Sequence, residues 1–182
     1  AIIENRQDFI NKILEYIVHH CSEQVVEELI KQEPIVNQLL RWRDRQECTP
    51  LIVFVERNFA NVAPELIKRG ASTDERNSSG EKILMIVARH GYLEMARNII
   101  KAKRNIVLDR NVGLASNALP RRHSLNPLFY AARFAQHRML ELLLESGVDP
   151  NTRSIGDSSQ LIPDSQRQVF IDLVTRNHPR PI

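Results

Sequence analysis

The sequence is poor in cysteine, glycine and aromatic residues, and each scarcity excludes a class of protein. Only two of its 182 residues are cysteine, Cys21 and Cys48, and two cysteines form neither a disulfide framework nor a metal-ligand pattern. We therefore expect reduced thiols in an intracellular protein, cytoplasmic or nuclear. Aromatic residues make up 5% of the chain, which leaves few platforms on which nucleic-acid bases could stack.

Long apolar runs and a leader segment are also missing. The longest runs, such as Leu51–Val55 and Ile83–Ala88, are far shorter than the roughly 20 residues that cross a bilayer. No charged and then apolar leader with a cleavage site opens the sequence, so we expect a protein that is neither secreted nor inserted in a membrane. Apolar residues still make up 42% of the chain, which allows a sizeable core.

Catalytic patterns are absent as well. The six glycines form no phosphate-binding loop, dinucleotide-binding pattern or GxSxG motif. His19 and His20 are adjacent, so on a helix they point in different directions, and neither has a cysteine or acid at a metal-binding spacing. The sequence predicts a non-enzymatic protein with no cofactor and no metal ion.

What the chain does contain is an internal repeat. Thr49–Ala71 reads as two short helices that are closed by a glycine turn, and the same pattern returns 33 residues later, from Lys82. A third copy starts at Asn126 and reaches its closing glycine, Gly147, after 21 positions, the same spacing that separates Thr49 from Gly70. Such a period is typical of a solenoid, in which each unit stacks on its neighbours.

The repeat resembles that of the ankyrin repeat family. The shared features are the Thr-Pro-Leu opening at Thr49, the pair Ala131-Ala132, the leucine pair before Gly147 and the Gly-Val-Asp-x-Asn turn that Gly147 begins. The resemblance covers residues 8–175 and implies an all-α ankyrin-repeat solenoid of stacked helix-turn-helix units. The histidine that the family carries after Thr-Pro-Leu is replaced by Ile52, Met85 and Phe129. We therefore expect apolar packing to carry more of the coupling between units.

The resemblance divides the chain as follows. A single domain, 1–182, has units at about 8–36, 43–75, 76–105 and 120–152, and a C-terminal capping helix at about 164–177. Asp8 is the expected N-cap of the first helix, and Pro34 is expected to follow the end of the second. About four extra residues lie around Val36–Trp42.

The turn between the third and fourth units is enlarged. Lys82 and Asn126 are 44 residues apart, eleven more than the period, so we expect a finger loop at 103–124 that projects from the turn edge. Irregular loops between repeats are similar to those of the inhibitors of Rel/NF-κB-type transcription factors. Arg121-Arg122-His123-Ser124 resembles the pattern read by basophilic kinases, which makes Ser124 a candidate phosphorylation site.

The repeat register also predicts a concave binding face, which is built from the first helix of each unit. Combined with the finger, it yields a set of predicted partner contacts: Tyr16, His19, Val53, Arg57, Ile86, Arg89, His90, Arg110, Arg121, Arg122, His123, Tyr130, Arg133 and Phe134. Tyrosine and arginine are frequent among the residues that dominate interfaces. For Ile86 and Phe134 the alternative is packing against a neighbouring unit.

Three functions follow from these patterns. The first is a protein-interaction module, scaffolding or regulatory, that binds a protein or peptide segment through the groove, the turn tips and the finger. Between Arg97 and Arg138 nine lysines and arginines face a single acid, Asp109, which favours an acidic or phosphorylated partner. The second is binding of an anionic ligand or nucleic acid through that basic region. The third is a passive spacer in a longer protein.

Overall fold

The predicted all-α solenoid is confirmed. A computed structural model describes residues 2–103, 127–148 and 164–177, and the regular elements in these ranges are all α-helices. In chain order they are α1 (Ile2–His20), α2 (Glu23–Ile30), α3 (Glu33–Arg41), α4 (Pro50–Glu56), α5 (Val62–Lys68), α6 (Ile83–His90), α7 (Leu93–Ala102), α8 (Pro127–Arg133), α9 (His137–Glu145) and α11 (Asp164–Asn177).

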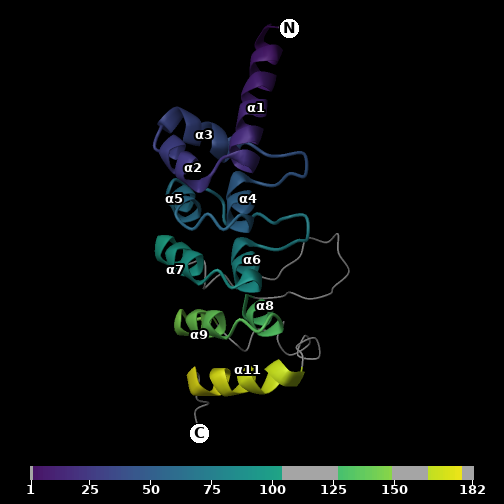
Figure 1. Cartoon of the computed structure of the whole chain (residues 1–182), viewed down its shortest axis with the longest axis vertical. Coiled ribbons are helices and arrows are strands. Elements are labelled where there is room, and N and C mark those ends of the chain that lie inside the picture. Colours follow the sequence, from purple (N-terminus) through teal and green to yellow (C-terminus); the bar gives the residue numbers. More distant parts are fainter. Residues whose placement is uncertain (1, 104–126, 149–163, 178–182) are drawn as a thin grey trace.

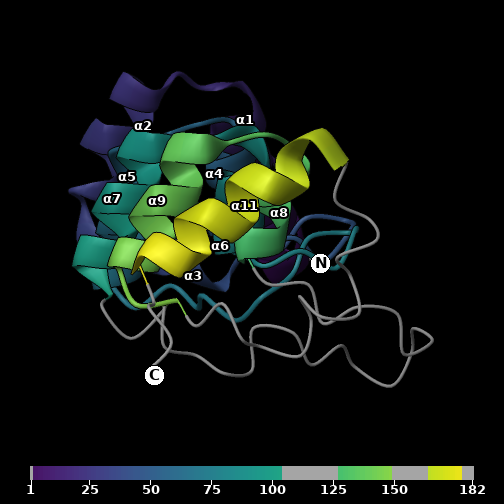
Figure 2. The ribbon, with the colours of Figure 1, turned by 90° about the horizontal axis from the view of Figure 1, so that it is seen from below.

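The helices stack in two columns (Figure 1). One column runs through α4, α6 and α8, and the other through α2, α5, α7 and α9, with α1 packed on α4 at one end. At the other end α11 lies across α8 and α9, as the view from below shows (Figure 2). One continuous apolar cluster runs through the stack from Leu14 to Leu173. Each unit therefore depends on its neighbours for burial.

The short helices of the first column are stabilised by tertiary packing. Helix α4 has seven residues and α6 has eight, too few to be stable alone in water. The side chain of Thr49 caps α4 by accepting a hydrogen bond from the backbone N–H of Ile52 at 3.3 Å, and all residues from Pro50 to Val55 are buried. All residues from Ile83 to Ala88 are buried too. These helices are apolar on every side because stacked units enclose them.

The turn inside each repeat needs a left-handed backbone at one residue. In the three repeats this residue is Asn58, Gly91 and Ala135, with φ of 60°, 73° and 56°. Glycine adopts such a φ freely, whereas alanine pays a steric cost. Packing of the flanking helices therefore imposes the turn at Ala135.

For the N-terminal unit, the second helix does end before Pro34, at Ile30, but the N-cap at Asp8 is wrong and a further helix was not predicted. Asp8 lies inside α1, which begins at Ile2, so it is not an N-cap. Residues Glu33–Arg41 form a further helix, α3, with Pro34 in its first turn. Proline is tolerated there because the N–H groups of a first turn have no partner within the helix. The proline that follows one helix therefore starts the next.

The units are coupled by polar contacts as well as by apolar packing. The Asn77 amide nitrogen donates to Glu56 Oε1 and to Glu81 Oε2, both at 3.0 Å. Its amide oxygen accepts from the backbone N–H groups of Ser79 and Glu81 at 3.0 and 2.9 Å. Because Glu56 ends α4 and Glu81 precedes α6, Asn77 joins the second unit to the third. Polar contacts therefore add to the coupling, of which we expect apolar packing to carry more than in the family pattern.

The same chain of contacts reaches the fourth unit. The Glu81 side chain is 7% exposed and accepts from Arg89 Nη2 at 3.0 Å. Burial, together with the charge of Glu81 and a hydrogen bond to it, raises the pKa of Tyr130 on α8 to about 12. A set of linked polar side chains, which we call the polar ladder, thus crosses three units: Glu56, Asn77, Glu81 and Tyr130.

Candidate interaction groove

A groove of about 410 Å³ opens where α1 and α4 meet two turns of the chain. The turns are the segments 42–49, between α3 and α4, and 69–82, between α5 and α6; both project from the α4–α6 side of the stack (Figure 1). Nine residues line this α1–α4 groove: His19, Asp44, Gln46, Cys48, Val53, Glu56, Arg57, Asn77 and Ser78.

The two carboxylates of the groove are held by hydrogen bonds. Asp44 Oδ1 accepts from the backbone N–H groups of Gln46 and Cys48, both at 2.8 Å, which is the local bonding by which aspartate shapes a turn. Glu56 stands at the last position of α4, where Asn77 donates to its Oε1 at 3.0 Å. Both side chains therefore have defined positions before any partner arrives.

Arg57 is anchored rather than free. Its Nη1 and Nη2 donate to the backbone carbonyls of Val18 and Cys21, both at 2.7 Å. Its guanidinium carbon lies 4.3 Å from the centroid of the Phe59 ring. A cation is favourable at the carbonyl end of a helix, so Arg57 ties the end of α1 to the second unit. Its charge serves the fold more than a ligand.

The floor of the groove is apolar. Val53 and Cys48 are both 7% exposed. Burial raises the pKa of the Cys48 thiol, and the nearby carboxylates of Asp44 and Glu56 raise it further. The thiol therefore stays protonated near neutral pH. Cys48 acts as a small apolar surface, not as a nucleophile.

The predicted contact residues of the first two units divide between groove and surroundings. His19, Val53 and Arg57 line the groove, and the His19 ring meets the Trp42 ring edge-on at 6.1 Å. Tyr16 is 62% exposed on α1, with its ring 5.1 Å from that of His20. The structure thus brings three predicted residues together and leaves Tyr16 on the adjoining surface.

In the third unit the structure corrects one prediction. Ile86 has no exposed surface and cannot touch a partner, because α6 is enclosed by α4 and α8. Arg89 is held by the buried Glu81. His90 is exposed, with its ring stacked at 5.0 Å on that of Tyr92.

The fourth unit contributes an aromatic stack. The rings of Tyr130 and Phe134 are parallel, with centroids 6.5 Å apart, and Phe134 is 44% exposed. Arg133 is exposed beside them. The remaining predicted contacts, Arg110, Arg121, Arg122 and His123, lie outside the described residues, as do Ser124 and most of the 103–124 finger.

The basic region is only partly described. Its described cations are exposed and lie on or beside α7, α8 and α9: Arg97, Lys101, Lys103, Arg133 and Arg138. Acidic side chains are interspersed on the same helices, Glu94 on α7 and Glu141 and Glu145 on α9. Lys103 Nζ donates to Thr73 Oγ1 at 2.7 Å. The helices that carry the described part of this region therefore present charges of both signs.

The predicted contacts lack six groove residues. One is Glu56 at the end of α4, and five are in the turns: Asp44, Gln46, Cys48, Asn77 and Ser78. The signal was available in part, because turn tips are binding regions of solenoids, and an aspartate followed by polar residues favours a turn. What the sequence does not give is which two turns approach the same helix.

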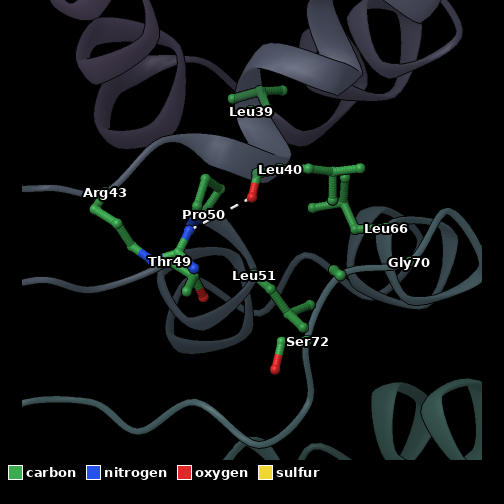
Figure 3. A pocket seen from close by; sticks show the side chains of 10 residues that line it. Leu39, Leu40, Arg43, Thr49, Pro50, Leu51, Leu66, Gly70 and Ser72 are labelled. Carbon is green, nitrogen blue, oxygen red and sulfur yellow. Dashed lines mark hydrogen bonds between the residues drawn. The ribbon is translucent and has the colours of Figure 1, made fainter.

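A second cleft, of about 140 Å³, lies between α3, α4 and α5 (Figure 3). Leu39, Leu51 and Leu66 extend toward it from the three helices. Arg43 is its one charged lining residue and is already bonded to the carbonyls of Leu40 and Trp42 at 3.4 and 2.9 Å. This cleft is a gap in helix packing.

Within residues 2–103, 127–148 and 164–177, no three histidine, cysteine or acidic side chains gather closely enough to hold a metal ion. No helix in these ranges is both long and apolar enough to span a bilayer.

Comparisons with known proteins agree with the fold. Residues 14–111 match the family model of three ankyrin repeats, and residues 123–155 match that of a single ankyrin repeat. The chain is also similar to the crystal structure of an ankyrin repeat domain from Acinetobacter baumannii, with a TM-score of 0.64 and 19% sequence identity over 92% of this chain and 83% of that one. None of the curated proteins compared with the sequence matches it.

Proposed function

Because the chain belongs to the ankyrin repeat family, we propose that it is a non-enzymatic module that holds a segment of a partner protein in the α1–α4 groove. Ankyrin repeats are generally protein-interaction modules. The observation that carries the proposal is the groove itself, where His19, Val53 and Arg57 meet side chains of two separate turns. Rigid elements with adaptable polar side chains around an apolar floor suit the recognition of a peptide segment.

The scaffolding or regulatory role follows from the same architecture. The polar ladder and the continuous apolar cluster hold the groove walls in fixed relative positions. A groove with fixed walls binds without a large ordering cost. We also propose an intracellular location, which the free thiols of Cys21 and Cys48 support.

The test compares three immobilised forms of the chain as baits. Ser78 is exposed and lines the groove, so Ser78→Trp should block it. Gln24 is exposed on α2, in the other helix column, so Gln24→Trp is the matched control. We expect one or more proteins to be retained by the wild type and by Gln24→Trp but to bind Ser78→Trp at least tenfold more weakly, as measured by calorimetry with the purified partner.

Circular dichroism and thermal unfolding show whether both variants keep the fold. Equal retention by all three baits would move the interaction away from this groove. Loss on the Gln24→Trp bait alone would move it to the α2 side.

A further inference from the structure

We propose that the α1–α4 groove selects partner segments that insert a lysine or arginine side chain between Asp44 and Glu56. This inference rests on the proposed function and names the chemistry of the partner. It reverses the expectation of an acidic partner, which followed from a count of charges along the sequence.

Each carboxylate has one oxygen engaged and one available. Asp44 uses Oδ1 to accept from Gln46 and Cys48, and Glu56 uses Oε1 to accept from Asn77. Among the described residues, Asp44 Oδ2 and Glu56 Oε2 have no hydrogen-bond partner. A cationic side chain with several N–H donors would satisfy both oxygens, and such charge-assisted bonds are stronger than neutral ones.

The neighbouring cations do not cancel these two charges. Arg57 donates through Nη1 and Nη2 to the carbonyl groups that end α1. Arg89 is paired with the buried Glu81. Two carboxylates, Asp44 and Glu56, and one cation, Arg57, line the groove, so with His19 neutral the lining carries a net charge of −1, although the chain as a whole carries +3.

The floor suits the alkyl stem of a long cationic side chain. Val53 and the protonated Cys48 thiol contribute apolar surface to the same groove as the two carboxylates. Lysine and arginine commonly bury their methylene groups against such a surface while the charged end meets polar groups. Burial raises the pKa of the Cys48 thiol most, and the nearby negative charges of Asp44 and Glu56 raise it further.

A metal ion fits the groove less well than a side chain. Although His19, Asp44, Cys48 and Glu56 all line it, no three such side chains in the described ranges gather closely enough to hold a metal ion. Structural cation sites use six or more oxygen ligands for calcium and four ligands for zinc.

The test selects peptides from a random heptapeptide phage library on the immobilised wild-type chain. Selected peptides are then synthesised, and each arginine is replaced by citrulline or each lysine by norleucine, which removes the charge. Binding is measured to the wild type, Asp44→Asn, Glu56→Gln and Ser78→Trp. Asn and Gln keep one oxygen that can accept the existing N–H donors, so the turn and the polar ladder are retained while the outward charge is lost. Glu141→Gln on α9, also an exposed carboxylate, is the matched control.

We expect selected peptides to share a lysine or arginine. Neutralising that residue, or Glu56→Gln, should weaken binding about tenfold, Ser78→Trp should abolish it, and Glu141→Gln should leave it unchanged. Where Asp44→Asn alters the turn, as judged by circular dichroism, Glu56→Gln carries the test alone.

Other outcomes separate the two proposals. Some peptides could lose binding to Ser78→Trp and yet bind equally well after the neutral replacements and to Glu56→Gln. That result would overturn the selection of a cation and leave the groove as the binding site. Acidic selected peptides would overturn it in the same way. Peptides that bind Ser78→Trp normally, or a library from which nothing is selected, would overturn both.

Discussion

Replacing Asn77 by aspartate tests the polar ladder most directly. The side chain is held at four points, and its amide nitrogen lies 3.0 Å from one oxygen of Glu56 and 3.0 Å from one of Glu81. Asn77→Asp keeps an oxygen for the two backbone donors but turns two attractive N–H···O contacts into contacts between negative oxygens. Losing two charge-assisted bonds and adding repulsion should cost about 4 kcal/mol of unfolding free energy at pH 7.

The cost should depend on pH, with a sign that follows from proton uptake. Like charges raise the pKa of the clustered carboxyls above their values in the unfolded chain, so the folded state of the variant binds more protons. Its stability relative to the wild type should therefore rise as pH falls, and the deficit should shrink to about 1 kcal/mol near pH 4. Asn77→Ala, which loses all four bonds without adding charge, should cost about 3 kcal/mol at either pH.

Urea unfolding followed by far-UV circular dichroism measures these differences. Ser79→Ala is the control in the same turn, because it keeps the backbone N–H that donates to Asn77. A deficit below about 1 kcal/mol for Asn77→Asp at pH 7, or one that grows as pH falls, would refute the role assigned to Asn77.

Two further predictions concern Tyr130 and Arg57. The folded state raises the pKa of Tyr130 from 10.0 to about 12, so the stability that its neutral hydroxyl contributes should be complete below pH 10 and lost as pH rises toward 12. Tyr130→Phe should lack this loss. If the unfolding free energy falls with the same slope in wild type and variant at alkaline pH, the prediction is contradicted. Arg57→Ala should lower the unfolding free energy by about 2 kcal/mol. It should also speed amide hydrogen exchange at residues 17–21 and leave exchange at residues 140–144 unaffected. Unchanged exchange at the end of α1 would show that Arg57 does not stabilise that end through the carbonyls of Val18 and Cys21.

The repeat and the fold could be predicted because they depend on local, periodic features. A glycine turn such as Gly91 and a buried apolar run such as Ile83–Ala88 recur at the distance that stacking requires. Helix α3 was missed because Pro34 was interpreted only as a stop after the second helix, whereas a proline is equally suited to the first turn of a new helix.

The site was less predictable because its members are selected by packing and pairing between units. When every residue of a helix is apolar, as in the first six positions of α6, periodicity cannot say which face is open, and Ile86 was placed on the wrong one. Arg57 and Arg89 count as cations in the sequence, yet the fold engages both. Asp44 and Asn77 gain their roles only when two turns 33 residues apart meet the same helix pair.

The polar ladder also limits how this chain can be rebuilt. Repeat arrays are commonly lengthened or shortened by whole units, because each interface resembles the next. Here one chain of contacts crosses three successive units, because Asn77 donates to Glu56 and to Glu81, and Tyr130 is hydrogen-bonded to the same buried carboxylate of Glu81. Deleting or duplicating one 33-residue unit would leave that carboxylate with the wrong neighbours. We therefore expect the central units to act as one block, and grafting of foreign repeats should be confined to the two ends.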